Sequence, residues 1–251
     1  MSSYGALADW YDSLTEDVDY EGLFDYLNAI MKRRGLRPRR VLDMACGTGS
    51  LSYLFAEHGY ETIGVDLSED MLVRAAAKAG ETSNQPIFYH GNMNSFVLQP
   101  KVDLLVCMLD SFNYMDTPQQ GRAAIKCFSR TVADQGLLVF DVRPPEQLRA
   151  FDGQMFMDET EDVVCIWRTE FDETENQCFY GMDIFVREGN LWRREQEEHL
   201  EYAFELSWIQ KELEAAGFSE IEIFGDRTFL SPAPGEERVY IVARKKDNGN
   251  E

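Results

Sequence analysis

The chain has 251 residues, of which 44% are hydrophobic and 27% are charged, so it can bury the core of one large α/β domain. Its formal net charge is -21, which argues against nucleic acids and anionic membranes as partners, because lysine and arginine bind both. The five cysteines form no C-x-x-C pair and the three histidines are far apart, so no metal site is expected. The unpaired cysteines, together with the lack of a signal-peptide pattern and of a long apolar run, favour a cytoplasmic protein.

A first helix is predicted over residues 19–35, where apolar side chains recur at helical spacing. Strands and helices then alternate. Strands are predicted at 39–45, 61–67, 86–92, 102–109 and 137–142, and helices at 50–59, 68–80 and 117–136. Ser68 and Thr117 are the expected N-caps of the last two helices. This alternation predicts a parallel sheet with helices on both faces.

The pattern changes after the fifth strand. Three strand-like runs, 162–171, 177–186 and 191–200, are separated by turn-like segments, and they predict an antiparallel insert. A helix at 207–218 and two strands at 220–225 and 238–245 then complete the domain. The expected fold is therefore a Rossmann-like, seven-stranded, mostly parallel α/β core. Its expected parts are a core (1–151 and 202–246), an insert (152–201) and a disordered tail (247–251), the insert serving as a substrate cover or a dimer surface.

The segment "VLDMACGTGSLS", residues 41–52, joins the first strand to the next helix. Gly47 and Gly49 let the backbone approach a ligand, but Ser52 stands where a dinucleotide-binding loop would have its third glycine. Asp43 beside this loop would repel a pyrophosphate and attract a cation. Asp66 ends the second strand, where a carboxylate can accept hydrogen bonds from both hydroxyls of a ribose. The pattern favours a ribose-bearing ligand with a positive centre.

With "GVDLSEDML", "HGNM" and "MLDSFNYM" following in order, this segment resembles the class I S-adenosylmethionine-dependent methyltransferases, in particular the small-molecule type. The resemblance covers about residues 11–142 and implies S-adenosylmethionine as the cofactor. Asn92 stands where many members have aspartate. The resemblance implies that the following residues lie around the cofactor: Tyr11, Tyr20, Asp43, Ala45, Gly47, Gly49, Asp66, Leu67, Met71, Asn92, Met93 and Leu109.

The acceptor site is expected at the end of the fourth strand and on the insert. His199 is the candidate general base because its ordinary pKa lies near neutrality, although a solvated position on an edge strand is the alternative. Asp110 either orients or deprotonates an acceptor, or caps a loop. The candidate substrate-contacting residues are Asn113, Tyr114, Arg143, Arg168, Tyr180 and Trp192.

The sequence therefore predicts methyl transfer to a small molecule, an amine being one candidate, by in-line displacement. Two other functions stay open at this point. One is a cofactor-binding sensor or assembly module without catalysis, and the other is a nicotinamide oxidoreductase, which Ser52 and Asp43 disfavour. The sequence does not distinguish N-, O- and C-methylation, the use of a general base, or a monomer from a homodimer formed through the insert.

Overall fold

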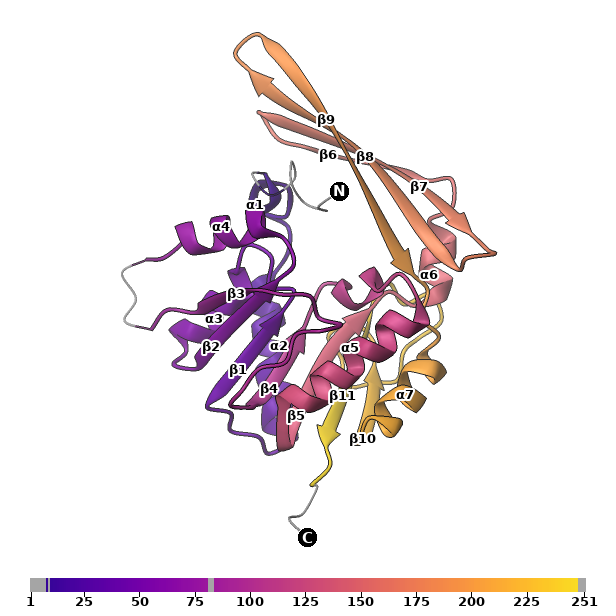
Figure 1. Ribbon diagram of the computed structural model, residues 1–251. Coiled ribbons are helices and arrows are strands. Elements are labelled where there is room, and N and C mark those ends of the chain that lie inside the picture. Colours follow the sequence, from indigo (N-terminus) through magenta and orange to yellow (C-terminus); the bar gives the residue numbers. More distant parts are fainter. Residues whose placement is uncertain (1–7, 9, 81–83, 248–251) are drawn as a thin grey trace.

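The computed structural model describes residues 8, 10–80 and 84–247. In this part of the chain, seven strands form the core sheet, in the order β10-β11-β5-β4-β1-β2-β3 (Figure 1). They are β1 (Arg40–Met44), β2 (Glu61–Asp66), β3 (Ile87–His90), β4 (Val102–Cys107), β5 (Val132–Val142), β10 (Phe218–Phe224) and β11 (Val239–Lys245). Strands β1 to β5 pair in parallel, whereas β11 runs antiparallel to β5 and β10. The predicted Rossmann-like, mostly parallel sheet is confirmed.

Helices surround this sheet, and the longer ones pack against it through an apolar face. The helices are α1 (Tyr11–Leu14), α2 (Tyr20–Arg33), α3 (Ser50–Glu57), α4 (Glu69–Ala77), η1 (Ser111–Tyr114), α5 (Pro118–Thr131), α6 (Pro145–Ala150) and α7 (Leu206–Ala215). The predicted caps are confirmed: Ser68 Oγ accepts from Met71 N, and Thr117 Oγ1 accepts from Gln120 N. The central strand β4 is almost wholly buried, as expected for a parallel strand covered on both faces.

The segment after α5 differs from the prediction. The expected helix over residues 117–136 ends at Thr131, and Val132 already has extended angles and pairs with Val102 of β4. Gln135 has a φ of 65°, and a Cβ at Gly136 would lie 2.8 Å from the Asp103 carbonyl oxygen. Residues 132–136 form the irregular first part of β5. They include polar residues that are common in helices, so the prediction of a helix there, which rested on residue type, was wrong.

The insert forms a separate antiparallel sheet in the order β6-β7-β8-β9 among the described residues. Its strands are β6 (Met155–Glu159), β7 (Val163–Asp172), β8 (Gln177–Glu188) and β9 (Leu191–Tyr202). Figure 1 shows it above the edge of the core sheet at which α1 and α6 lie. The short strand β6 was not expected, because all five of its residues are exposed and lack an alternating pattern.

The two faces of the insert sheet have different environments. Its inner face carries Cys165, Met182 and Ile184, which pack with Trp10 and Tyr11 near α1. On β9 the partners across the ladder place Glu197, His199 and Glu201 on this inner face. The outer face carries Arg168, Asp183 and Trp192. A strand alternates between faces at every residue, so this assignment decides which insert residues face the core domain.

In the described part of the chain, no helix has the length and apolarity required to cross a membrane, and no group of side chains has the makeup of a metal site. All five cysteines are free thiols. The disordered tail expected at residues 247–251 lies, apart from Asp247, outside the described residues.

Candidate functional site

The loop between β1 and α3 has a backbone that most side chains would not permit. Ala45, Gly47 and Gly49 all have left-handed φ values, of 60°, 55° and 80°. A Cβ at Gly49 would lie 2.8 Å from Phe88 Cζ, so packing excludes a side chain there. A Cβ at Gly47 would have no described atom within 4 Å. The absence of a side chain at Gly47 therefore leaves open space against the backbone, as a bound ligand requires.

Asp43 lies on β1 below this loop and is buried. Ser52 Oγ donates a 2.6 Å hydrogen bond to Asp43 Oδ2. Burial raises the Asp43 pKa to about 7, the Ser52 hydrogen bond acts in the opposite direction, and the nearby charge of Asp66 raises it further. Ser52 therefore donates a hydrogen bond to Asp43, a role that its position in place of a third glycine did not indicate. A cation placed beside Asp43 would favour its ionised form.

Asp66 at the end of β2 fixes the loop through backbone hydrogen bonds. Its two carboxylate oxygens accept from Gly47 N and from Ser68 N, both at 2.8 Å. Burial raises the Asp66 pKa, and these two backbone donors partly offset the effect. Each carboxylate oxygen has a second lone pair, so Asp66 can still accept from a ribose diol while it holds the loop.

The residues predicted beside the adenine lie at the ends of β2 and β3. Gly91 N donates to the Asp66 carbonyl oxygen at 2.9 Å, which ties the "HGNM" segment to the end of β2. Leu67 is 59% exposed, whereas Met71 and Met93 are buried. Asn92 Oδ1 accepts from Asn94 N at 3.0 Å. An exposed leucine next to buried methionines provides an apolar surface for a planar base.

Helix α1 is attached to the glycine loop by a polar cluster that sequence reasoning missed. Asp12 accepts from Thr48 Oγ1 at 2.6 Å and lies 2.7 Å from Lys78 Nζ. Tyr20 lies near Asp12 and Asp43, and burial with these charges raises its pKa to about 12. Tyr11 lies close enough to hydrogen-bond Tyr20. Only the acids of the "DWYD" segment could have indicated this cluster.

Asp110 follows β4 in a left-handed conformation, with a φ of 55° next to Leu109 at 59°. It forms ion pairs with Arg143 and with Arg238, and its N–H donates to Asp141 Oδ1. Burial opposes ionisation, but the two guanidinium groups outweigh it and hold the Asp110 pKa below its usual range. Asp110 is therefore a weak proton acceptor that orients Arg143. Sequence reasoning missed Arg238, and it read Asp141 only as part of a strand.

Asn113 and Tyr114 in η1 connect the core domain to β9. Asn113 is fully buried, and its Nδ2 donates to the carbonyl oxygens of Arg143 and Tyr202 at 3.2 and 3.1 Å. Its Oδ1 accepts from Arg143 N at 3.0 Å. Tyr114 packs edge-on against His199, with ring centroids 5.7 Å apart. These contacts place β9 directly beside the end of β4.

The inner face of β9 is acidic and buried where it meets η1. His199 is 3% exposed, and its Nε2 lies 3.2 Å from Glu197 Oε2. Glu201 Oε2 lies 4.0 Å from Arg143 Nε, and Tyr180 is its neighbour on the same face. Burial raises the Glu201 pKa to about 8, and the charge of Asp110 adds to this effect. The burial of His199 contradicts the solvated-strand alternative. Glu201 was not anticipated.

Arg168 and Trp192 do not lie with the other predicted acceptor residues. Arg168 forms an ion pair with Asp183 on the outer face, and Arg194 binds the same carboxylate. Trp192 is 48% exposed near the β8–β9 turn, opposite Arg187. Both side chains therefore point away from the face that carries Tyr180 and His199.

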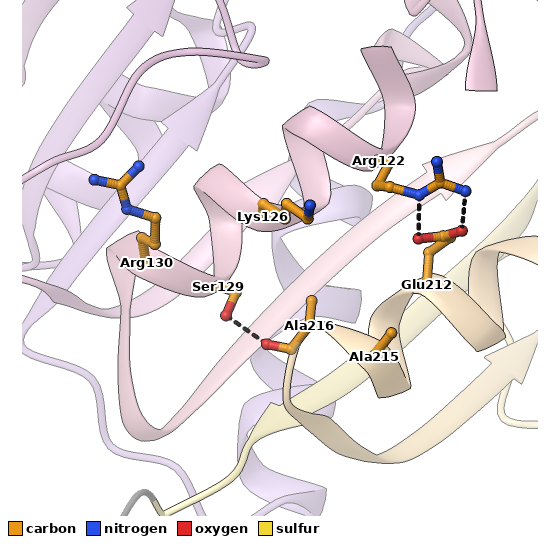
Figure 2. Close-up of a pocket in the computed structure, with 7 residues that line it drawn as sticks. All are labelled: Arg122, Lys126, Ser129, Arg130, Glu212, Ala215 and Ala216. Atoms are coloured by element: carbon orange, nitrogen blue, oxygen red, sulfur yellow. Dashed lines mark hydrogen bonds and ion pairs between the residues drawn. The ribbon is translucent and has the colours of Figure 1, made fainter. Parts of the chain in front are cut away.

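A surface pocket of about 230 Å³ lies between α5 and α7, where Figure 2 shows its lining residues. Its walls include the Arg122–Glu212 ion pair and the hydrogen bond from Ser129 Oγ to the Ala216 carbonyl oxygen. None of the predicted site residues lines it. Because ligands of parallel sheets bind at the carboxyl ends of the strands, we do not assign the cofactor to this pocket.

Comparison with known proteins agrees with this geometry. Residues 41–136 match the methyltransferase domain family. The chain is 31% identical to the putative methyltransferase YqeM of Bacillus subtilis over 96% of this chain and 97% of that protein. A crystal structure of an S-adenosylmethionine-dependent methyltransferase from Clostridium acetobutylicum superposes with a TM-score of 0.87 at 26% identity, covering 97% and 99% of the two chains. A Streptomyces venezuelae enzyme, dTDP-3-amino-3,4,6-trideoxy-alpha-D-glucopyranose N,N-dimethyltransferase, is 29% identical over 53% of this chain and 56% of that one.

Proposed function

Because the chain belongs to the class I S-adenosylmethionine-dependent methyltransferases, we propose that it methylates the nitrogen of a small-molecule amine. Membership of this class decides against both the non-catalytic module and the nicotinamide oxidoreductase. The observation that carries the choice of an amine is the inner face of β9, where His199 and Glu201 are buried near the end of β4 and Glu197 beside them is partly buried. An acid-lined site favours a cationic acceptor over an anionic one.

The relative from Streptomyces venezuelae supports the same class of acceptor, since its name describes N,N-dimethylation of an amino sugar. That match covers only about half of each chain, so it supports an amine in general and not that sugar nucleotide in particular. The cytoplasmic location remains a prediction from composition and free cysteines.

The chain's residues are arranged to bind and orient the cofactor. S-Adenosylmethionine supplies a methyl group already activated on a positively charged sulfur. We assign Asp66 to the ribose hydroxyls, the Gly47–Gly49 loop to the amino-acid end, and Asp43 to the charge near that end. Leu67, Met71, Asn92 and Met93 border the adenine, and the remaining assigned residues are Tyr11, Tyr20, Ala45 and Leu109.

The amine must lose a proton before its lone pair can attack. We assign this proton to His199, whose buried ring is oriented by Glu197 and Tyr114. With S-adenosylmethionine bound, the amine lone pair would form the N–C bond as the C–S bond breaks, and the electrons of the C–S bond would stay on the sulfur. Asp110 acts as a positioning residue, because it holds Arg143 beside the inner face. Enclosure of the reacting atoms by the insert would exclude water.

The experiment that tests this function has two stages. Calorimetry first measures binding of S-adenosylhomocysteine, which we expect to bind tightly. Radiolabelled methyl transfer is then measured against a panel of amino sugars, amino acids and other amines, with phenols and carboxylic acids as comparison acceptors. Turnover of an amine well above that of every phenol and acid supports the proposal. Turnover confined to phenols or acids contradicts it.

The outer face of the insert remains the proposed dimer surface. Met155, Met157 and Trp192 are exposed there by 69%, 61% and 48%. The methionines lie on the edge strand β6 and Trp192 on the opposite edge strand β9, so apolar side chains are exposed at both edges of this face, and such exposure is more common at interfaces than on free surfaces. Analytical ultracentrifugation of the wild type and of Met157→Glu tests this proposal: a dimer that the substitution dissociates supports it, and a wild-type monomer contradicts it.

A further inference from the structure

A buried cluster of charged side chains connects the end of β4 to the insert. Among the described residues it contains three carboxylates, Asp110, Asp141 and Glu201, and two guanidinium groups, Arg143 and Arg238. Arg238 and Arg143 together neutralise Asp141 and Asp110, which they contact directly. Glu201 is the third carboxylate, and its nearest cationic atom, Arg143 Nε, is 4.0 Å away. The ionised cluster therefore has one negative charge in excess.

Two oxygen atoms at the Glu201 end of this cluster have lone pairs that can still accept hydrogen bonds. Glu201 Oε2 and Tyr180 Oη are buried and form no hydrogen bond of ordinary geometry with the described residues, although Tyr180 lies close enough to Glu201 to interact with its carboxylate. Their residues are 4% and 7% exposed. Buried polar atoms are nearly always hydrogen-bonded, and leaving a charged one without a partner is costly. Two such atoms, side by side on one sheet face, are an arrangement that a ligand with several N–H donors would complete.

We propose that Glu201 and Tyr180 form the subsite that receives the acceptor's ammonium group when the acceptor first binds. Burial raises the pKa of Glu201 in the free protein, and the positive charge of a bound ammonium would lower that pKa again, so Glu201 would ionise as the ammonium binds and the two charges would balance. The three N–H groups of the ammonium can donate to both oxygens. The proposal rests on the proposed function and deepens it, because it names the residues that select a cationic acceptor.

The surroundings of Glu201 fit this role. Arg143 is held at the subsite by Asp110, and its guanidinium also lies over the Phe151 ring, 5.3 Å from the centroid. The other ionisable groups that face Glu201 are Asp110, Arg238, Cys178 and Tyr180, with Glu197 and His199 further along the same face of β9. His199 lies two residues before Glu201 on that face, so an ammonium bound at Glu201 lies beside the proposed proton acceptor.

The test compares two sugars that differ in one group. D-Glucosamine and D-glucose are each titrated by calorimetry into the protein saturated with S-adenosylhomocysteine, at a pH at which the amine is protonated. We expect the wild type to bind glucosamine at least about 10-fold more tightly than glucose, as a charge-assisted hydrogen bond allows. Glu201→Gln should reduce this preference by about 10-fold or more, and Tyr180→Phe should reduce it by a few-fold.

Glu198→Gln is the matched control, because Glu198 lies on the opposite, outer face of the same strand. It should retain the preference of the wild type. Glutamine has the shape of a protonated glutamate, so Glu201→Gln should fold, and its thermal melt and its S-adenosylhomocysteine affinity verify this.

The outcomes separate the two proposals. Equal affinities of the wild type for the two sugars, or an undiminished preference in folded Glu201→Gln, overturn the subsite. S-Adenosylhomocysteine binding and amine turnover in that same preparation would leave the proposed function standing. Failure of the wild type to methylate any amine contradicts the proposed function itself, whatever the sugars show.

Discussion

The cofactor edge of the core sheet and the inner face of the insert are built in different ways. At the cofactor edge the backbone forms the site: Gly47 N and Ser68 N donate to Asp66, and Gly49 has a left-handed φ and packs too closely against Phe88 to carry a Cβ. On the insert, side chains from one face of β9 form the site. A site made by the backbone depends on residue type at fixed positions, whereas a site made by strand side chains depends on register and on which face is buried.

The largest expected effect tests the face assignment on β9. His199→Ala should lower turnover of the amine about 100- to 1,000-fold, because the proton acceptor is lost, while S-adenosylhomocysteine affinity stays unchanged. Trp192→Ala, on the outer face of the same strand, should change turnover less than about 2-fold. The measurement is radiolabelled methyl transfer together with calorimetry. Similar losses of turnover in both variants would mean that the catalytic group is not confined to the inner face of β9.

The next effect tests the cofactor edge. Asp66→Ala removes the proposed ribose acceptor and the acceptor of two backbone N–H groups, so S-adenosylhomocysteine should bind about 100-fold more weakly. Asp70→Ala is the control, because Asp70 is exposed on α4 nearby. Calorimetric titration with S-adenosylhomocysteine gives the ratio of the affinities of the two variants. An affinity for Asp66→Ala equal to that of the control would remove Asp66 from the cofactor site.

Sequence predicted the core sheet well, because glycines, caps and buried apolar runs act locally. The N-caps Ser68 and Thr117 and the ends of β1 and β2 were predictable for this reason. The entry into β5 was not, because Gln135 and Gly136 adopt their conformation through contacts with β4.

Much of the candidate site depends on partners distant in sequence. Arg238 reaches Asp110 and Asp141 from the start of β11, and Lys78 reaches Asp12 from the end of α4. No local pattern reveals such pairs. The insert adds a further difficulty, because Glu201 lies in an acidic run in which Glu195, Glu197 and Glu198 are chemically alike. Only the ladder with β8 shows which of them face the core domain.

A smaller effect sharpens the account of the glycine loop. Gly49→Ala should reduce the free energy of unfolding by about 3 kcal/mol, because it adds a left-handed alanine and a Cβ that overlaps Phe88. Gly47→Ala meets no described atom and should cost only about 1 kcal/mol. Urea denaturation measures both. If the two losses are equal, contact with Phe88 does not explain why glycine stands at position 49.

The smallest expected effect separates stability from function on the insert. Glu201 has a pKa of about 8 in the folded protein and 4.5 as the ordinary value, so between these pH values the unfolded chain releases a proton that the folded protein retains. The free energy of unfolding contributed by this group therefore falls as pH rises from about 4.5 to 8.

Glu201→Gln has no such ionisation. It should match the wild type in stability at about pH 4 and exceed it by on the order of 2 kcal/mol at about pH 6. Thermal or urea unfolding at both pH values, on the wild type and on Glu198→Gln as control, gives the difference. A variant that is less stable than the wild type at about pH 6 would mean that Arg143 already satisfies Glu201 in the folded protein. A gain in stability together with weaker amine binding would show that Glu201 lowers the stability of the insert and is there for the acceptor.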